Sequence, residues 1–483
     1  MSATLIVIII AIYFALLLLI GRISSRGAGN EAFFIGERKS PWYVVAFGMI
    51  GASLSGVTFI SVPGWVTDSQ FSYMQMVLGY LVGYTVIAQV LMPMYYRLRL
   101  TSIYSYLDGR FGKASYKTGA SFFLLSRVIG ASFRLFLVAS VLQMTVFDSW
   151  NLPFFVTVLV TLALIWLYTN KGGIRTIIWT DTLQTFSMLT AVVVSVILIT
   201  RSMDLQMGEM IRRVIDSADS RIWVFDDWHK GNHFVKHFLS GAFITIVMTG
   251  LDQDMMQKNL SCKNIREAKK NMYLMSLSLV PVNLLFLFLG AVLIQFVQFQ
   301  GLSMPEASDQ LFPMIATGGY LPAVVGIFFM VGLVAAAYSS ADSALTSLTT
   351  SFTVDILEAG DWESGRLSRT RRRVHIAISF VLALVILVFR AINDESVISA
   401  LFRFAGYTYG PLLGLYAFGL FTRRRVRDRL VPVFAILSPI LSFLLSRFSS
   451  LLFGGYEFGF ELLIVNGAIM FGFLFLISRK NDG

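Results

Sequence analysis

Long runs of apolar residues, separated by short polar stretches, dominate this chain of 483 residues. Several runs exceed about 18 residues, the length at which a helix rising about 1.5 Å per residue crosses a hydrocarbon layer of about 30 Å. A membrane β-barrel would instead show segments of roughly ten residues that alternate between apolar and polar. The pattern therefore predicts an all-α polytopic membrane protein.

A hydropathy window of about 19 residues predicts thirteen membrane spans. Six precede the longest polar stretch, at 3–21, 43–65, 72–96, 118–146, 152–169 and 177–200. Seven follow it, at 238–257, 272–298, 320–350, 374–391, 396–421, 430–446 and 461–478. The first run has no basic residues before it and no small-residue cleavage site, so we interpret it as a transmembrane helix and not as a secretory signal.

The polar stretch 201–236 carries six basic and six acidic residues around Trp223, Phe225 and Trp228. We expect a short amphipathic helix here, on the outer surface of the protein. It would serve as a connector or as an outer lid, and we favour the connector.

Composition and charge agree with a membrane protein. The chain is 56% hydrophobic and 14% charged, which excludes a water-soluble globular fold. The net charge of +11 indicates topology and not a nucleic-acid partner, because Lys and Arg gather in alternate connections between spans. The basic clusters lie at 22–39, 97–117, 171–175, 258–270, 366–373, 423–429 and 479–480. We therefore expect a multi-pass protein of the cell (inner) membrane, with its N-terminus outside and its C-terminus in the cytoplasm.

Two predicted spans contain glycine, proline and hydroxyl residues at membrane depth. One is the segment 48–64 in the second span, and the other is 240–252 in the seventh. Irregular backbone is tolerated at that depth only where it lines a cavity. The two spans are five apart, so a five-helix repeat would make them equivalent, as in inverted-repeat transporters. Ordinary packing of small residues between helices is the alternative.

The ninth span carries a stripe of small and hydroxyl residues. Ala336, Ser339, Ser340 and Ser343 recur at i, i+3, i+4 and i+7, so they share one helix face. Their oxygens suit an alkali cation, although serines alone also serve as packing residues. Asp342 lies beside the stripe, and an acidic group inside a membrane helix is functional by default. The ninth span is thus a candidate Na⁺ site.

Arg134 lies about sixteen residues into the fourth span, too deep to reach an interface comfortably. Its planar guanidinium suits a carboxylate, which would belong either to a substrate or to the protein itself. Arg127, nearer the helix start, suits a snorkelling or gate residue.

Enzyme chemistry is not indicated. The four histidines, His229, His233, His237 and His375, lie at loops or membrane borders, and neither a nucleophile elbow nor an H-E-x-x-H motif is present. The lone Cys262 excludes an intramolecular disulfide. A sensor or channel built on the same scaffold is the other functional class that we consider. We expect no kinase or receiver domain after the last span, which argues against a sensor. No obligate protein partner is evident.

The run from Gly172 to Gln184 resembles the Gly-Gly…Trp-Thr-Asp…Gln motif of the sodium:solute symporter family. That family includes sodium/glucose, sodium/proline and sodium/sialic acid cotransporters. The runs 339–343 and 410–415, together with Asp355 and Ile356, are also similar to it. The resemblance implies an inverted five-helix repeat of the LeuT type, with one preceding and two following helices. The implied units are 1–40, a first repeat at 41–200, the connection 201–236, a second repeat at 237–422, and 423–483.

The resemblance also implies cation ligands. The positions that match the principal sodium site of the family are Gly56, Phe59, Ala336, Ser339 and Ser340. A second sodium site of some members would here comprise Asp181, Ser339, Asp342 and Ser343. Asp342 departs from members that have serine, so it would bind Na⁺ or hold a proton. One Na⁺ per cycle is expected, and two remain open.

For the substrate, the resemblance favours an anionic solute over a neutral hexose. Pro63, Leu81, Thr245 and Leu279 stand where sugar-transporting members have amide or charged groups. Arg134 stands where sialic acid transporters have a carboxylate-binding arginine. The other expected contacts are the hydroxyls of Thr58, Ser61 and Thr245 and the walls of Phe59, Tyr80 and Phe243. We therefore expect a Na⁺ symporter for a carboxylate-bearing solute such as a sialic acid or another sugar acid. A neutral sugar or polyol, a monocarboxylate or an amino acid is the alternative.

Overall fold

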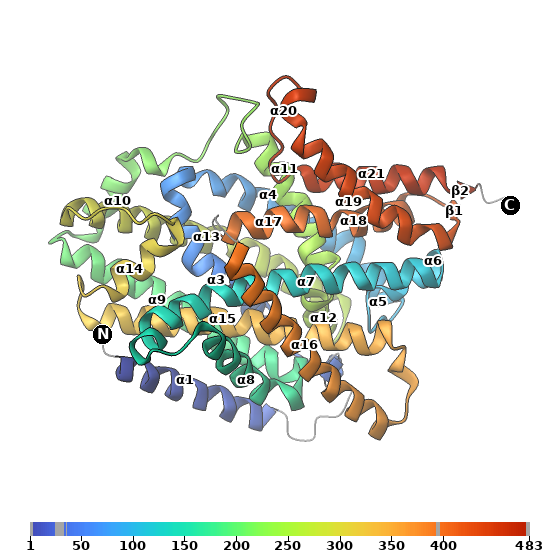
Figure 1. The fold of residues 1–483 in the computed structure, drawn as a ribbon, viewed down its shortest axis with the longest axis horizontal. Coiled ribbons are helices and arrows are strands. Elements are labelled where there is room, and N and C mark those ends of the chain that lie inside the picture. Colours follow the sequence, from blue (N-terminus) through green and yellow to red (C-terminus); the bar gives the residue numbers. More distant parts are fainter. Residues whose placement is uncertain (1–2, 25–32, 35, 393–396, 480–483) are drawn as a thin grey trace.

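The computed structural model describes residues 3–24, 33–34, 36–392 and 397–479. Within these ranges the chain is almost entirely helical, with one antiparallel pair of two-residue strands, β1 (Arg425–Val426) and β2 (Ser478–Arg479). The N- and C-terminal ends lie at opposite ends of the molecule (Figure 1). The predicted all-α membrane fold is thereby confirmed.

The helices of the first half begin with α1 (Ala3–Ser24) and α3 (Trp42–Ser69). They continue with α4 (Tyr73–Val86), α5 (Met92–Arg97), α6 (Ser105–Arg110), α7 (Lys113–Leu142), α8 (Phe154–Gly172) and α9 (Ile174–Ser202). The connection after α9 contains α10 (Met207–Asp216), which confirms the predicted short helix. Its Met210 and Val214 are buried while Ile211 and Ile215 are exposed.

The helices of the second half begin with α11 (Phe234–Thr245) and α12 (Gln253–Leu260). They continue with α13 (Ile265–Gln300), α14 (Leu311–Thr317), α15 (Ala323–Ser351), α16 (Ser364–Ile392), α17 (Val397–Thr408), α18 (Gly410–Phe421), α19 (Val431–Arg447), α20 (Ser449–Leu452) and α21 (Leu462–Leu476). Helices α15, α17 and α18 run roughly along the long axis of the molecule, while α16 and α19 slant across it (Figure 1).

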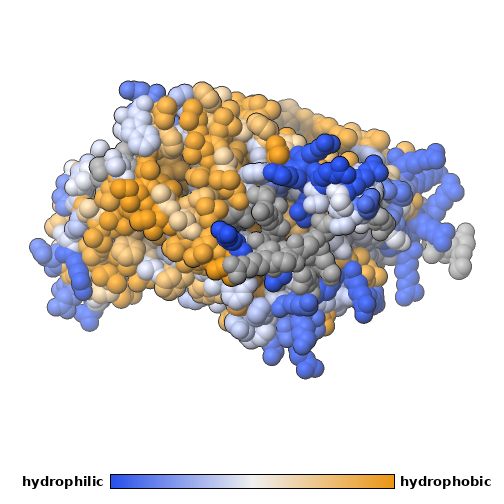
Figure 2. Space-filling view, turned by 90° about the horizontal axis from the view of Figure 1, so that it is seen from below, coloured by the Kyte–Doolittle hydropathy of each residue, from blue (hydrophilic) through white to orange (hydrophobic). Residues whose placement is uncertain are grey.

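Eight helices of the described chain are long and apolar enough to cross a membrane, and nine when the bent pair of α11 and α12 counts as one span. One of them, 42–97, contains two predicted spans, and three shorter apolar helices match further ones. The number thirteen and the repeat boundaries at 41–200 and 237–422 stay predictions. Figure 2 shows a broad apolar surface between hydrophilic groups at the two ends, as expected for a protein surrounded by lipid.

Both predicted helix breaks are present. In α3 the backbone leaves the helical region at Ser55, whose φ is 41° and ψ is 172°. In the seventh predicted span a π-helical turn at Ile246–Gly250 follows α11, and the chain then bends by 64° into α12. Asp252 caps α12 by accepting hydrogen bonds from the backbone N–H groups of Asp254 at 2.9 Å and Met255 at 3.4 Å. This cap satisfies donors that the bend would otherwise leave unpaired.

Small residues bring the broken helices close to their neighbours. α3 packs against α9, α13 and α15, while α11 packs against α4. A methyl group at Gly51 would overlap Thr185 of α9, and one at Gly241 would overlap the backbone oxygen of Met76 in α4. Close approach of backbones is the usual way in which membrane helices gain packing energy.

Gly241→Ala should therefore lower the thermal stability of the purified protein, because α11 and α4 would have to separate. The expected loss is about 1–3 kcal/mol, the usual range for overpacking. Thermal unfolding in detergent measures it. Gly472→Ala is the matched control, since that helical glycine is exposed and nothing lies within 4 Å of an added methyl group. Equal melting temperatures for the two variants would contradict the close approach.

Candidate functional site

A pocket lies between the two helix breaks. α3 contributes Ser53, Ser55 and Thr58, and the region of the second break contributes Thr245 and Thr249. The remaining walls come from α4, α7, α13 and α17, with the side chains Tyr73, Tyr80, Tyr84, Arg127, Arg134, Asn283 and Phe402. The pocket thus combines hydroxyl groups, aromatic surfaces and two guanidinium groups.

Four of the predicted substrate contacts meet in this pocket: Thr58, Tyr80, Arg134 and Thr245. The Tyr80 hydroxyl lies 2.9 Å from that of Tyr73, so the two phenols form one polar pair on the wall. The other three predicted contacts do not line the pocket. Phe59 packs against Phe312 and Phe329, and Phe243 packs against the core. Ser61 is fully buried.

Arg134 is a buried cation without a protein counter-ion. Its side chain is on α7 and the residue is 8% exposed, and its Nε has no hydrogen-bond partner. Among the described residues no side chain forms an ion pair with it. An uncompensated charge in such a place is unfavourable. The pocket is therefore electrostatically suited to an anion.

Arg127 lies about two turns before Arg134 on α7 and is paired with carboxylates of the protein, although its Nε has no hydrogen-bond partner in the described chain. It forms an ion pair with Asp254, and its Nη1 lies 3.9 Å from Oδ2 of Asp252. The Tyr409 hydroxyl donates to the same Asp252 oxygen at 2.5 Å. Tyr409 lies between α17 and α18. This cluster therefore joins α7, α12 and the α17–α18 junction next to the pocket wall that Arg127 forms, which fits the gate residue that we considered for Arg127.

The predicted principal cation ligands lie where α3 and α15 meet. A methyl group at Gly56 would lie 3.8 Å from the Ala337 Cα, and one at Gly332 would overlap the Phe59 ring. The break at Ser55 interrupts the helical hydrogen bonding of α3 just before Gly56. Ala336, Ser339 and Ser340 are buried on the facing helix, and Ser340 donates to the Ala336 carbonyl at 3.3 Å. Carbonyl and hydroxyl oxygens of this kind fit Na⁺.

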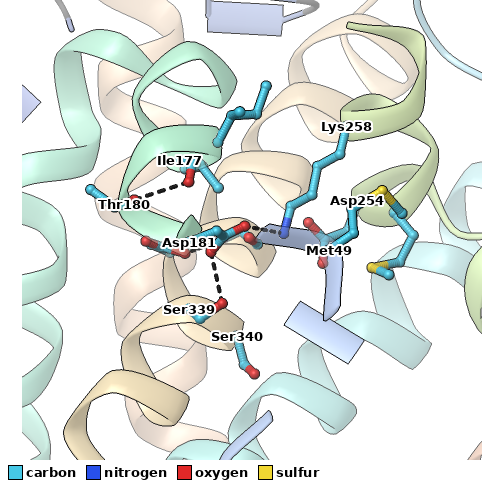
Figure 3. A network of polar contacts seen from close by, with 12 residues as sticks. Met49, Ile177, Thr180, Asp181, Asp254, Lys258, Ser339 and Ser340 are labelled. Carbon is cyan, nitrogen blue, oxygen red and sulfur yellow. Dashed lines mark hydrogen bonds and ion pairs between the residues drawn. The ribbon is translucent and has the colours of Figure 1, made fainter. Parts of the chain in front are cut away.

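A residue outside the second predicted set contacts one of its members, Asp181. We expected Lys258 in a basic cytoplasmic connection, but its ammonium is buried and lies 2.7 Å from Oδ2 of Asp181. The Ser339 hydroxyl donates to Oδ1 of the same carboxylate at 2.7 Å. Figure 3 shows Lys258 and Ser339 each joined to Asp181, Lys258 beside the carboxylate and Ser339 below it. One signal was available: the run 252–259 is densely polar and lies at the end of a predicted span.

The rest of that second set lies on α15. Asp342 is fully buried, and its Oδ1 accepts a hydrogen bond from the Ser343 backbone N–H at 2.5 Å. The Ser343 hydroxyl has no partner in the described chain. The structure thus places Asp181, Ser339, Asp342 and Ser343 on two neighbouring helices, α9 and α15.

Comparison with known proteins identifies the family to which the chain belongs. Residues 33–428 match the profile described as the sodium:solute symporter family. The sodium/iodide cotransporter of Homo sapiens is 26% identical over 82% of this chain and 62% of its own length, so the chain spans about three fifths of that relative. The sodium/sialic acid symporter SiaT of Proteus mirabilis is 24% identical over 91% of this chain and 88% of its own length.

Solved structures show the same fold. A Na⁺-coupled sialic acid symporter in a substrate-bound, outward-open state matches with a TM-score of 0.85 at 20% identity, covering 99% of both chains. The nucleobase-cation-symport-1 transporter Mhp1 matches with a TM-score of 0.56 at 15% identity, over 92% of this chain and 94% of its own. The predicted LeuT-type transporter fold is confirmed, and the chain belongs to the sodium:solute symporter family.

Proposed function

We propose that the protein is a secondary active symporter that uses Na⁺ to import a small polar solute bearing a carboxylate, such as a sialic acid or another sugar acid. The observation that carries this proposal is the buried, uncompensated guanidinium of Arg134 in the pocket between the two breaks. The names of two relatives, SiaT and the sialic acid symporter NanT of Aliivibrio fischeri, support the choice of substrate.

A carboxylate in this pocket would complete the electrostatics of Arg134. A guanidinium offers two parallel N–H donors that match the two oxygens of a carboxylate. The hydroxyls of Thr58 and Thr245 would receive the polar groups of the sugar, and Tyr80 would cover an apolar face. A neutral polyol would leave the buried charge unpaired, so we favour the anion over it. Monocarboxylates share the same chemistry, and a sodium-coupled monocarboxylate transporter of Mus musculus is 26% identical.

Coupling would occur through the principal cation set, Gly56, Phe59, Ala336, Ser339 and Ser340. It connects the broken helix α3 to α15, so an ion held there would bias how the two helices sit relative to each other. Moving one charge through 100 mV yields about 2.3 kcal/mol. A tenfold concentration gradient adds about 1.4 kcal/mol, for a total of about 3.7 kcal/mol per Na⁺.

The polar cluster around Arg127, at the pocket wall, suits the role of an inner gate. Arg127, Asp252, Asp254 and Tyr409 connect three helical segments through charged contacts that rigid-body motion would break. We propose that release of the solute to the cytoplasm requires this cluster to open, with the N-terminus outside and the C-terminus inside.

Uptake of labelled N-acetylneuraminate into proteoliposomes tests the proposal. We expect uptake under an inward Na⁺ gradient and none when K⁺ replaces Na⁺. Arg134→Ala should raise the half-saturating solute concentration roughly 10- to 100-fold, since a hydrogen bond to a charged group contributes about 1.5–3 kcal/mol. Arg134→Lys keeps the positive charge but loses the two parallel N–H donors. Its half-saturating solute concentration should lie between those of the wild type and Arg134→Ala. Arg447→Ala, at an exposed helix end, is the control.

Uptake of N-acetylneuraminate that is unchanged in Arg134→Ala would contradict direct recognition of the carboxylate. An absence of uptake by the wild type in Na⁺ would remove sialic acid as the solute. A screen of monocarboxylates, neutral sugars, inositols and amino acids would then identify the substrate class.

Ser340→Ala should raise the Na⁺ concentration for half-maximal uptake about tenfold, because it removes one hydroxyl ligand of the principal set. The dependence of uptake on Na⁺ at fixed solute measures this change. Ser347→Ala is the matched control, since Ser347 is buried on the same helix and donates to its own backbone at the Ala344 carbonyl. Identical Na⁺ dependence in the wild type and Ser340→Ala would refute the assignment.

A further inference from the structure

Lys258 places a positive charge among the ligands of the second candidate Na⁺ site. Its Nζ lies 2.7 Å from Oδ2 of Asp181, and both residues are about 1% exposed. The Ser339 hydroxyl occupies the other oxygen, Oδ1, at 2.7 Å. In Figure 3 the lysine side chain is extended toward the carboxylate. Both oxygens of Asp181 are thus engaged by groups of the protein.

An ammonium and a sodium ion carry the same charge and compete for the same carboxylate. Two unit cations a few ångströms apart repel each other strongly in a medium of low dielectric constant. A Na⁺ ion bound to Asp181 would therefore have to displace the Lys258 ammonium. The ammonium is covalently attached to α12, so its local concentration at Asp181 far exceeds that of a dissolved ion.

The helix that carries Lys258 is itself held in place. All eight residues of α12 are buried. The Gln257 amide donates to the Phe34 carbonyl and to the Thr350 hydroxyl at 3.1 Å, while Asn271 donates to the Asn259 side chain at 2.6 Å. On the preceding turn Asp254 is paired with Arg127. Lys258 is therefore held at Asp181 by a buried, anchored helix. It differs in this from a surface lysine whose flexible side chain happens to point toward the protein.

The contact leaves Ser339 available to the principal set. Because its hydroxyl proton points to Asp181, the oxygen keeps lone pairs for a cation elsewhere. Ser339 belongs to both predicted sets, and with Lys258 on Asp181 it can serve only one of them. The charge of Asp181 is neutralised without a dissolved ion.

We propose that the Lys258 ammonium is a tethered cation that fills the Asp181 position, and that the chain binds one Na⁺, at the principal set. This inference rests on the proposed Na⁺-coupled function. It predicts that removal of the lysine opens a second Na⁺ site at Asp181, whereas a merely structural ion pair would create none.

Binding of ²²Na⁺ to the purified protein in detergent tests this stoichiometry without knowledge of the solute. The wild type should bind one Na⁺ per chain. Lys258→Met keeps most of the buried stem but frees the carboxylate, and it should bind two. The double variant Lys258→Met/Asp181→Asn removes both charges and should return to one.

Two Na⁺ bound by the wild type, or one bound by a folded Lys258→Met, would overturn the tethered cation. If Lys258→Met fails to fold, Lys258→Gln takes its place, since it also removes the ammonium and keeps the Asp181 carboxylate. Two Na⁺ bound by a folded Lys258→Gln support the proposal, and one overturns it. No Na⁺ bound by the wild type would overturn the Na⁺-coupled function as well, which distinguishes the two failures.

Discussion

Backbone groups inside a hydrocarbon layer must be hydrogen-bonded, and the rest of this structure depends on how the chain meets that constraint. The helix breaks at Ser55 and at 246–252 interrupt the regular hydrogen bonding of two spans. Such breaks persist only where polar groups, a ligand or an ion can pair with the freed groups. The pocket, its buried arginine and the hydroxyl groups of α15 all lie around these two breaks. The location of the site is therefore a consequence of the backbone, and the side chains then determine what it binds.

The short helix α12 connects the buried charges of the molecule. Its N-terminal carboxylates meet Arg127 of α7, and its lysine, one turn further on, meets Asp181 of α9. Each removal of one partner would leave a charge buried alone, which typically destabilises a protein by about 3–5 kcal/mol. Because both pairs are carried by eight consecutive residues, a movement of α12 must change both. The proposed inner gate and the proposed second cation position are thus mechanically linked.

Much of the site could be predicted from the sequence, because depth in a membrane span constrains polar residues strongly. The two breaks and the buried position of Arg134 followed from glycine, hydroxyl and charged residues at membrane depth. The direction of individual side chains did not. Successive residues of a helix point about 100° apart, so Thr58 faces the pocket while Phe59 faces an aromatic cluster. Lys258 escaped prediction for another reason: it lies just past a predicted span, and its partner is 77 residues away.

The position of Lys258 also bears on how membrane voltage acts on the carrier. If the ammonium remains on Asp181, the proposed symport would carry one Na⁺ and one monocarboxylate anion together, and the translocated pair would have no net charge. The voltage that drives Na⁺ inward then opposes the anion equally. Accumulation of the solute would depend on the Na⁺ concentration ratio alone, and depolarisation of the membrane would leave it intact. A single buried lysine would in this way make transport electrically silent.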